Sequence, residues 1–177
     1  MLPASGEERM IIRYAVSIAL AACLPAVAAP PGPSQNLVAA QFDGMKALVG
    51  IWRPADATDS PLRIRFSLTA GGTVLVEEWT RNGRPHSLTL YHRDGAGLIA
   101  THYCPQGNQP RLTLLPTSQG RLLRFEYRDA TDLDPENESH VTALAFDLSD
   151  PALLLRSESY RKRGVSAPSE LRLVRVQ

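Results

Sequence analysis

Glu77 and Tyr103 are the two side chains whose types and spacing best suit chemistry in this 177-residue sequence. Both lie in segments where apolar and polar residues alternate, as in β-strands with one buried face. Pairing across the intervening turns puts both on the apolar face, close enough for a hydrogen bond between phenol and carboxylate. A buried carboxylate without a partner is costly, so Glu77 needs a donor, a cation or water beside it. Such a pair could orient a ligand, or supply an acid and a base to an enzyme.

Other candidate chemistry is weaker. His102 and Cys104 are two residues apart on one predicted strand, about 7 Å between Cα atoms, but we expect them on the outer face, without a third group to orient them. His86, His92 and His102 do not share a face, which argues against a three-histidine metal site. The sequence also has no Gly-x-Ser-x-Gly elbow, phosphate-binding glycine loop or His-Glu-x-x-His motif. We therefore assign no catalytic residue, metal or cofactor.

The elements that would position these residues are mostly strands. With a strand at Trp52, ten short strands follow one another at a spacing close to ten residues, which is typical of sandwiches and barrels. Short turns such as Gly71-Gly72 and Asn82-Gly83 favour an up-and-down order, and closure removes the two exposed edges. We expect an all-β fold: a single up-and-down antiparallel β-barrel of about 8–10 strands with a short N-terminal helix. The strands are predicted at 62–68, 73–80, 86–93, 98–104, 111–115, 121–127, 140–147, 153–160 and 170–176.

The helix is predicted over residues 36–49, because Val38, Phe42, Met45 and Val49 recur at helical spacing. Ser34 is the expected N-cap, and Gly50 the stop.

The turns also fix which side chains face inward, because register decides faces. Across Gly71-Gly72, Phe66 pairs with Glu77. Across Asn82-Gly83, we expect Trp79 opposite His86 and Glu77 opposite Leu88. The predicted inner face carries Leu62, Ile64, Phe66, Leu68, Leu75, Trp79, Leu88, Leu90, Ile99, Leu112 and Leu114. The predicted outer face carries Arg63, Arg65, Glu78, Ser87, Thr89, His102 and Cys104.

A barrel of this size can enclose a small apolar or amphipathic ligand. The residues that we expect to bind it are Phe66, Glu77, Trp79, Leu88, Leu90, His92 and Tyr103. Two alternatives stay open. One is an enzyme that uses Glu77 and Tyr103 as acid and base, and the other is a structural or interaction domain whose barrel is filled by side chains.

The N-terminus has the pattern of an exported protein. Arg13 precedes an apolar run that ends near Leu24, and Ala26-Val27-Ala28 suits a cleavage site. The run is too short for a transmembrane helix. We expect a signal peptide at 1–28, a linker at 29–36 and the barrel at 37–177, with Met10 as an alternative start. The mature protein would be periplasmic or secreted. Alternatively, Leu20–Cys23 would act as a lipobox, with Cys23 carrying a lipid anchor in the cell envelope.

Composition limits the partners. A net charge of +1 argues against nucleic acid as a partner. If the leader is removed, Cys104 is the only cysteine left and no intramolecular disulfide can form. The sequence does not decide the oligomeric state.

Two stretches resemble a known superfamily. Gly50-Ile51-Trp52 resembles the Gly-x-Trp motif that opens the first strand of lipocalins and related calycin barrels. Leu90–Gly95, Thr101–Cys104 and Gly107–Arg111 are together similar to exported bacterial lipocalin-like proteins of uncharacterised function. The resemblance implies a barrel plugged by Trp52 at one end and open at the other to hydrophobic ligands. Related nitrobindin barrels bind haem through a histidine near the C-terminus, and residues 141–177 contain none, so we do not expect haem.

Overall fold

The structure, a computed structural model, describes residues 33–176 and contains one α-helix and ten strands. The predicted signal peptide lies outside the described residues, as does the start of the linker. The helix is α1 (Pro33–Lys46). The strands are β1 (Gly50–Pro54), β2 (Leu62–Thr69), β3 (Val74–Arg81), β4 (Arg84–Asp94), β5 (Gly97–Tyr103), β6 (Gln109–Leu114), β7 (Leu122–Thr131), β8 (His140–Asp147), β9 (Leu154–Lys162) and β10 (Val165–Arg175).

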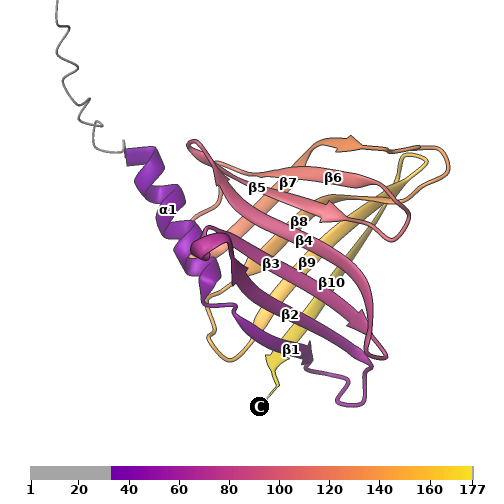
Figure 1. The fold of residues 1–177 in the computed structure, drawn as a ribbon, viewed down its shortest axis with the longest axis horizontal. Helices are drawn as coiled ribbons and strands as arrows, with labels where there is room; N and C mark the ends of the chain where they lie inside the picture. Colours follow the sequence, from indigo (N-terminus) through magenta and orange to yellow (C-terminus); the bar gives the residue numbers. More distant parts are fainter. Residues whose placement is uncertain (1–32, 177) are drawn as a thin grey trace, which may run out of the picture. The chain divides into compact units, whose positions relative to one another are not determined.

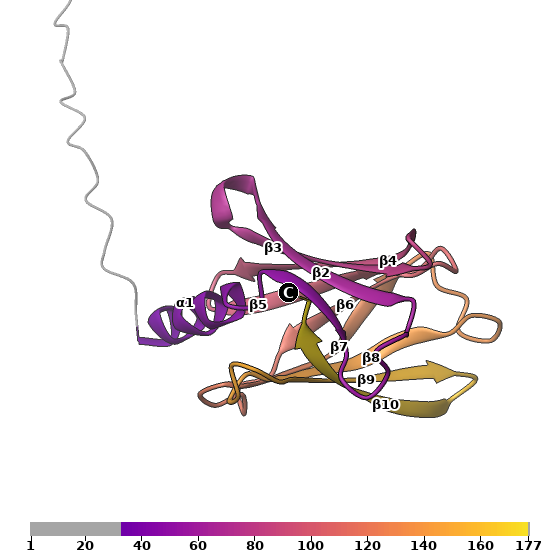
Figure 2. The ribbon, with the colours of Figure 1, turned by 90° about the horizontal axis from the view of Figure 1, so that it is seen from below.

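The ten strands form one closed barrel in which each strand pairs with its sequence neighbours (Figure 1). Every pairing is antiparallel, and the barrel closes where Trp52 of β1 pairs with Arg175 of β10. Figure 2 shows β2, β3 and β4 on one side and β8, β9 and β10 on the other. The predicted all-β, up-and-down barrel with a short helix is confirmed. Within residues 33–176, no helix is both long enough and apolar enough to cross a membrane.

Helix α1 packs at one end of the barrel. Val38, Phe42 and Met45 are buried and join the barrel core, as their spacing predicts. The helix ends at Lys46, so Val49 does not continue the apolar face and is 41% exposed. Its start is also earlier than expected, because α1 begins at Pro33 and so includes Ser34, the predicted N-cap.

Trp52 is the central residue of the packing at the α1 end of the barrel. Its ring is buried, its Nε1 donates to the Leu48 carbonyl at 2.8 Å, and the Arg175 guanidinium lies 4.4 Å from the ring centroid. Arg175 also donates to the carbonyls of Ala47 and Val49, the latter at 2.7 Å, just after α1. Gly50 has a φ of 140°, and an added Cβ would lie 2.5 Å from Arg175 Nη1. This turn therefore favours glycine.

The strand register agrees with prediction until β4. Phe66 pairs with Glu77 as expected, although the turn is a short 3₁₀ segment, Ala70–Gly72. Between β3 and β4, Thr80 pairs with Pro85 but Trp79 pairs with Ser87, so His86 is an extra residue in β4. This β-bulge shifts the pairing by one residue, and a one-residue shift exchanges the two faces of a strand.

The bulge overturns the predicted faces of β4 and β5. Thr89, not Leu88, pairs with Glu77. Thr89 in turn pairs with His102, so the exchange carries over to β5. Leu88, Leu90 and Ile99, expected inside, take outward positions in this register, although Ile99 is still buried there at 6% exposure. Thr89 and His102, expected outside, are buried inside. Leu68 shares the Phe66 face but is 40% exposed beside the turn.

Aromatic rings fill the centre of the barrel. Tyr91 makes edge-to-face contacts with Phe125 and Phe146, each with ring centroids 5.7 Å apart, and Phe66 contacts Phe146 at 6.5 Å. All four residues are at most 1% exposed. Edge-to-face contacts of this kind stabilise the packing beyond the burial of area alone, so this part of the interior is occupied by the protein's own side chains.

Candidate functional site

The candidate site begins at Glu77, a fully buried carboxylate in the middle of β3. Its Oε1 accepts hydrogen bonds from Trp79 Nε1 and from Arg156 Nε, both at 2.6 Å. Its Oε2 accepts a hydrogen bond from the Tyr91 hydroxyl. These three donors meet the requirement that a buried carboxylate be paired.

Arg156 reaches Glu77 from β9, 79 positions later in the chain. It is 1% exposed, and its Nη1 also donates to Glu158 Oε2 at 2.6 Å. Its guanidinium lies 4.7 Å from the Trp79 ring centroid, a cation–π geometry. Burial lowers the pKa of Arg156, but the charges of Glu77 and Glu158 outweigh it, so the pKa is raised and the side chain is charged.

Tyr91 takes the place that the sequence suggested for Tyr103. Burial and the neighbouring Glu77 charge raise the pKa of the Tyr91 phenol well above its ordinary value, while Arg156 and a hydrogen bond from Thr89 oppose the shift. The phenol is therefore neutral, and its hydroxyl donates a hydrogen bond to the carboxylate. Tyr103 lies on the outer face and is 42% exposed, so the predicted pair of Glu77 and Tyr103 does not form.

His102 forms a second part of the same interior. Its Nδ1 lies 2.9 Å from Thr89 Oγ1, and its Nε2 lies 3.2 Å from the Tyr160 hydroxyl. Burial, more than any neighbouring charge, lowers the pKa of His102 to about 4. The pKa of Tyr160 is raised, by burial first and then by Glu158. At neutral pH the imidazole is uncharged, so one ring nitrogen donates and the other accepts.

We call these residues together the interior polar network. The side chains of Glu77 and Arg156 are 0% and 1% exposed, and that of Glu158 is 16% exposed. Most of its hydrogen-bonding groups find partners within the protein. Since these partners come from different strands, the network holds β3, β4, β5 and β9 together across the barrel. Its members are Glu77, Trp79, Thr89, Tyr91, His102, Arg156, Glu158 and Tyr160.

Three of the seven predicted ligand-binding residues are inside the barrel. Phe66, Glu77 and Trp79 are buried there. The other four, Leu88, Leu90, His92 and Tyr103, lie on the outer face because of the His86 bulge. The prediction that all seven share one face is therefore wrong.

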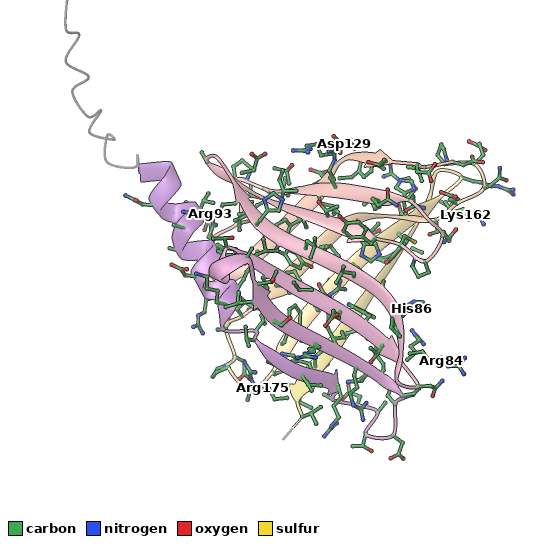
Figure 3. The ribbon with its side chains drawn as sticks, viewed as in Figure 1. Arg84, His86, Arg93, Asp129, Lys162 and Arg175 are labelled. Carbon is green, nitrogen blue, oxygen red and sulfur yellow. The ribbon has the colours of Figure 1, made fainter. Side chains whose placement is uncertain are left out.

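The bulge also forms a pocket, which we call the bulge pocket. It has a volume of about 550 Å³, within the range of small-molecule sites. Trp79 and Leu88 line it, and so does Tyr103 from β5. Figure 3 shows His86, another lining residue, at the end of the barrel away from α1. The remaining lining residues are Arg65, Glu78, Thr80, Pro85 and Ser87.

Sequence reasoning missed the partners of Glu77 for two reasons. Tyr91 faces inward only because of the His86 bulge. Pro85 was the one signal for that bulge, since proline in a strand tends to mark a bulge or an edge. Arg156 lies far away in sequence, and no hairpin connects β9 to β3. Leu154, Arg156 and Glu158 are two positions apart and so share one face of β9. With the apolar Leu154 on that face, the pattern could have indicated that charged residues face inward.

Cys104 is half-buried and follows directly after β5. Its thiol lies 3.9 Å from the Ser139 carbonyl, to which Asn108 Nδ2 also donates at 3.2 Å. In the described part of the chain, no three His, Cys, Asp or Glu side chains come together as metal ligands would.

The fold and the interior define a closed, ten-stranded antiparallel β-barrel with a charged network in its core. No family model matches the sequence, and no curated protein matches it. Among solved structures, the chain is similar to the crystal structure of Rv2717c from M. tuberculosis. That match has 16% sequence identity and a TM-score of 0.46, and it covers 84% of this chain and 100% of the other.

Proposed function

We propose that this protein binds a small amphipathic ligand in the bulge pocket. The observation that carries the proposal is the pocket itself: about 550 Å³ of space beside three residues that the sequence singled out as ligand contacts, Trp79, Leu88 and Tyr103. The centre of the barrel is packed with aromatic rings, which favours a site on the wall over one in the centre.

The lining of the bulge pocket suits an amphipathic ligand. Leu88 and the aromatic rings offer apolar surface, and Tyr103 is accessible at 42% exposure. Arg65 and Glu78 add one charge of each sign beside them. Apolar surface with a few polar groups at its margin is the usual character of a small-molecule pocket.

The interior polar network fixes one lining residue of the bulge pocket, Trp79. Trp79 is fixed by its hydrogen bond to Glu77 and by the Arg156 guanidinium over its ring. A rigid ring binds a ligand at a lower entropic cost than a mobile one. In this proposal Glu77 orients Trp79 and does not itself contact the ligand. Phe66, Leu90 and His92 do not line this pocket.

Binding of 8-anilinonaphthalene-1-sulfonate, an amphipathic dye, tests the proposal. We expect saturable binding to the full chain that weakens about tenfold or more in Leu88→Asp and Tyr103→Ser, since each loses apolar contact. Val165→Asp is the matched control, because Val165 is a 72% exposed hydrophobic residue that does not line the pocket.

Two results would overturn the proposal. One is dye binding that none of the pocket variants changes. The other is absence of binding to the folded wild-type protein, which is the result expected of a barrel that serves only as a structural or interaction domain.

We also propose that the protein is exported, on the pattern of residues 1–28. The intact mass of protein isolated from its natural host tests this. A chain that begins after Ala28 indicates a cleaved signal peptide, and a lipid-modified chain that begins at Cys23 indicates an envelope anchor. A chain that keeps residues 1–28 contradicts both.

We further propose that the barrel is related to the calycins. The support is the position of Gly50-Ile51-Trp52, which opens β1 directly after α1, with the Trp52 ring buried at the α1 end.

A further inference from the structure

A second pocket of about 320 Å³ lies at the α1 end of the barrel, between the helix and two loops. We call it the helix-end pocket. Gly44 of α1, Arg121 of the β6–β7 loop and Asp150 of the β8–β9 loop form part of its wall. Its floor is formed by buried apolar residues of the barrel core. These are Trp52, Leu123 and Leu154.

Gly44 is the feature that points to a ligand. A glycine inside a helix is destabilising relative to alanine, so it needs a reason. Gly44 has no positive φ, and an added Cβ would meet no atom within 4 Å. The fold therefore does not require glycine at this position. What the missing side chain does provide is open space along the wall of the pocket.

Two arginines give the pocket its charge. Arg175 is held on the Trp52 ring and donates to the carbonyls after α1, and Arg121 donates to the Leu148 carbonyl at 3.0 Å. A guanidinium has five N–H groups, so both arginines keep donors for a ligand. The acidic wall residue, Asp150, already accepts a hydrogen bond from the Ala152 N–H at 2.8 Å.

We propose that the helix-end pocket binds a small carboxylate with an apolar body. The apolar part would lie on the Trp52 floor beside Gly44, and the carboxylate would pair with Arg121 and Arg175. Arginine suits this role, because its planar N–H groups match the two carboxylate oxygens. The site is independent of the bulge pocket, which is formed at the opposite end of the barrel.

Nitrogen-15 NMR of the full chain with sodium octanoate tests the proposal. The sequence has two tryptophans, one beside each pocket, so two indole N–H signals can be followed and assigned with Trp52→Phe. We expect octanoate to shift the Trp52 signal saturably. 1-Octanol, its uncharged counterpart, should bind about tenfold or more weakly, because the charge-assisted hydrogen bonds are lost.

Variants of the pocket sharpen the test. Gly44→Leu should fold normally, since the position is open and leucine favours helix, but its side chain should fill the pocket and abolish binding. Arg121→Met should weaken octanoate about tenfold. Arg172→Met, on an exposed arginine that does not line the pocket, should bind as the wild type does.

Three outcomes would overturn the proposal: no shift of the Trp52 signal, equal binding of octanol and octanoate, or wild-type binding by folded Gly44→Leu. The Trp79 signal reports on the bulge pocket separately. Failure of either proposed site therefore leaves the result for the other unaffected.

Discussion

Tyr91 donates a hydrogen bond to Glu77 from the neighbouring strand, at the next inward position after Thr89, which pairs directly with Glu77. The phenol–carboxylate contact expected in the interior therefore exists, but with a different tyrosine. This contact depends on the extra residue at His86, because without the bulge Tyr91 would face outward.

Tyr91 and Tyr103 give a direct test of the faces. Tyr91→Phe removes a donor from buried Glu77 and should lower the free energy of unfolding by about 1–3 kcal/mol. Tyr103→Phe changes an exposed hydroxyl and should stay within about 0.5 kcal/mol of wild type. Urea unfolding of the two variants measures both values. Equal losses would contradict the inward position of Tyr91.

Arg156 is expected to be the most sensitive position of the interior polar network. Arg156→Met leaves the Glu77 carboxylate buried without its cation, at a cost of about 3–5 kcal/mol. Adding Glu77→Gln removes the unpaired charge but keeps an oxygen for Trp79 and Tyr91, so the double variant should recover part of the loss. The same unfolding experiment measures both variants. A double variant less stable than Arg156→Met would argue against an ion pair.

His102 should make stability depend on pH. Its pKa falls from 6.5 to about 4 on folding, so between these values the unfolded chain binds a proton that the folded chain does not. The contribution is fully present above pH 6.5 and is lost as the pH falls towards 4, on the order of 3 kcal/mol in all.

Urea unfolding at several pH values checks this, with His102→Gln as the variant that removes the effect while keeping an amide for hydrogen bonding. Burial also lowers the pKa of His140. A His140→Gln variant is therefore needed to measure how much His140 contributes to the pH dependence of the free energy of unfolding. A pH dependence that His102→Gln leaves unchanged would refute the role of His102.

Substitutions of two glycines by alanine should change the free energy of unfolding in opposite directions. Gly50→Ala forces a side chain into a left-handed conformation and against Arg175, and should lower the free energy of unfolding by about 1–3 kcal/mol. Gly44→Ala meets open space in a helix and should raise it by about 0.5–1 kcal/mol. Thermal unfolding measures both. Destabilisation by Gly44→Ala would show that the fold itself requires this glycine.

The barrel could be predicted because its signals are local. Alternation indicated ten strands, and the short turns gave an up-and-down order that the structure confirms. The face of β4 could not be predicted by the same means. Leu88 and Leu90 alternate with Thr89 and Tyr91, so both faces are partly apolar and the pattern does not choose between them. The His86 bulge decides which residues of β4 face inward, and Pro85 was the only residue that indicated a bulge.

The sequence by itself determined the number of strands, their order and the position of Glu77 on the inner face of β3. Only the tertiary structure decided what surrounds Glu77. Closure of the barrel brings Arg156 of β9 across the interior, and the His86 bulge turns Tyr91 and His102 inward. The physical reason is that alternation and turn residues act between neighbours in sequence, whereas the partner of a buried charge is set by which strands face each other once the barrel has closed.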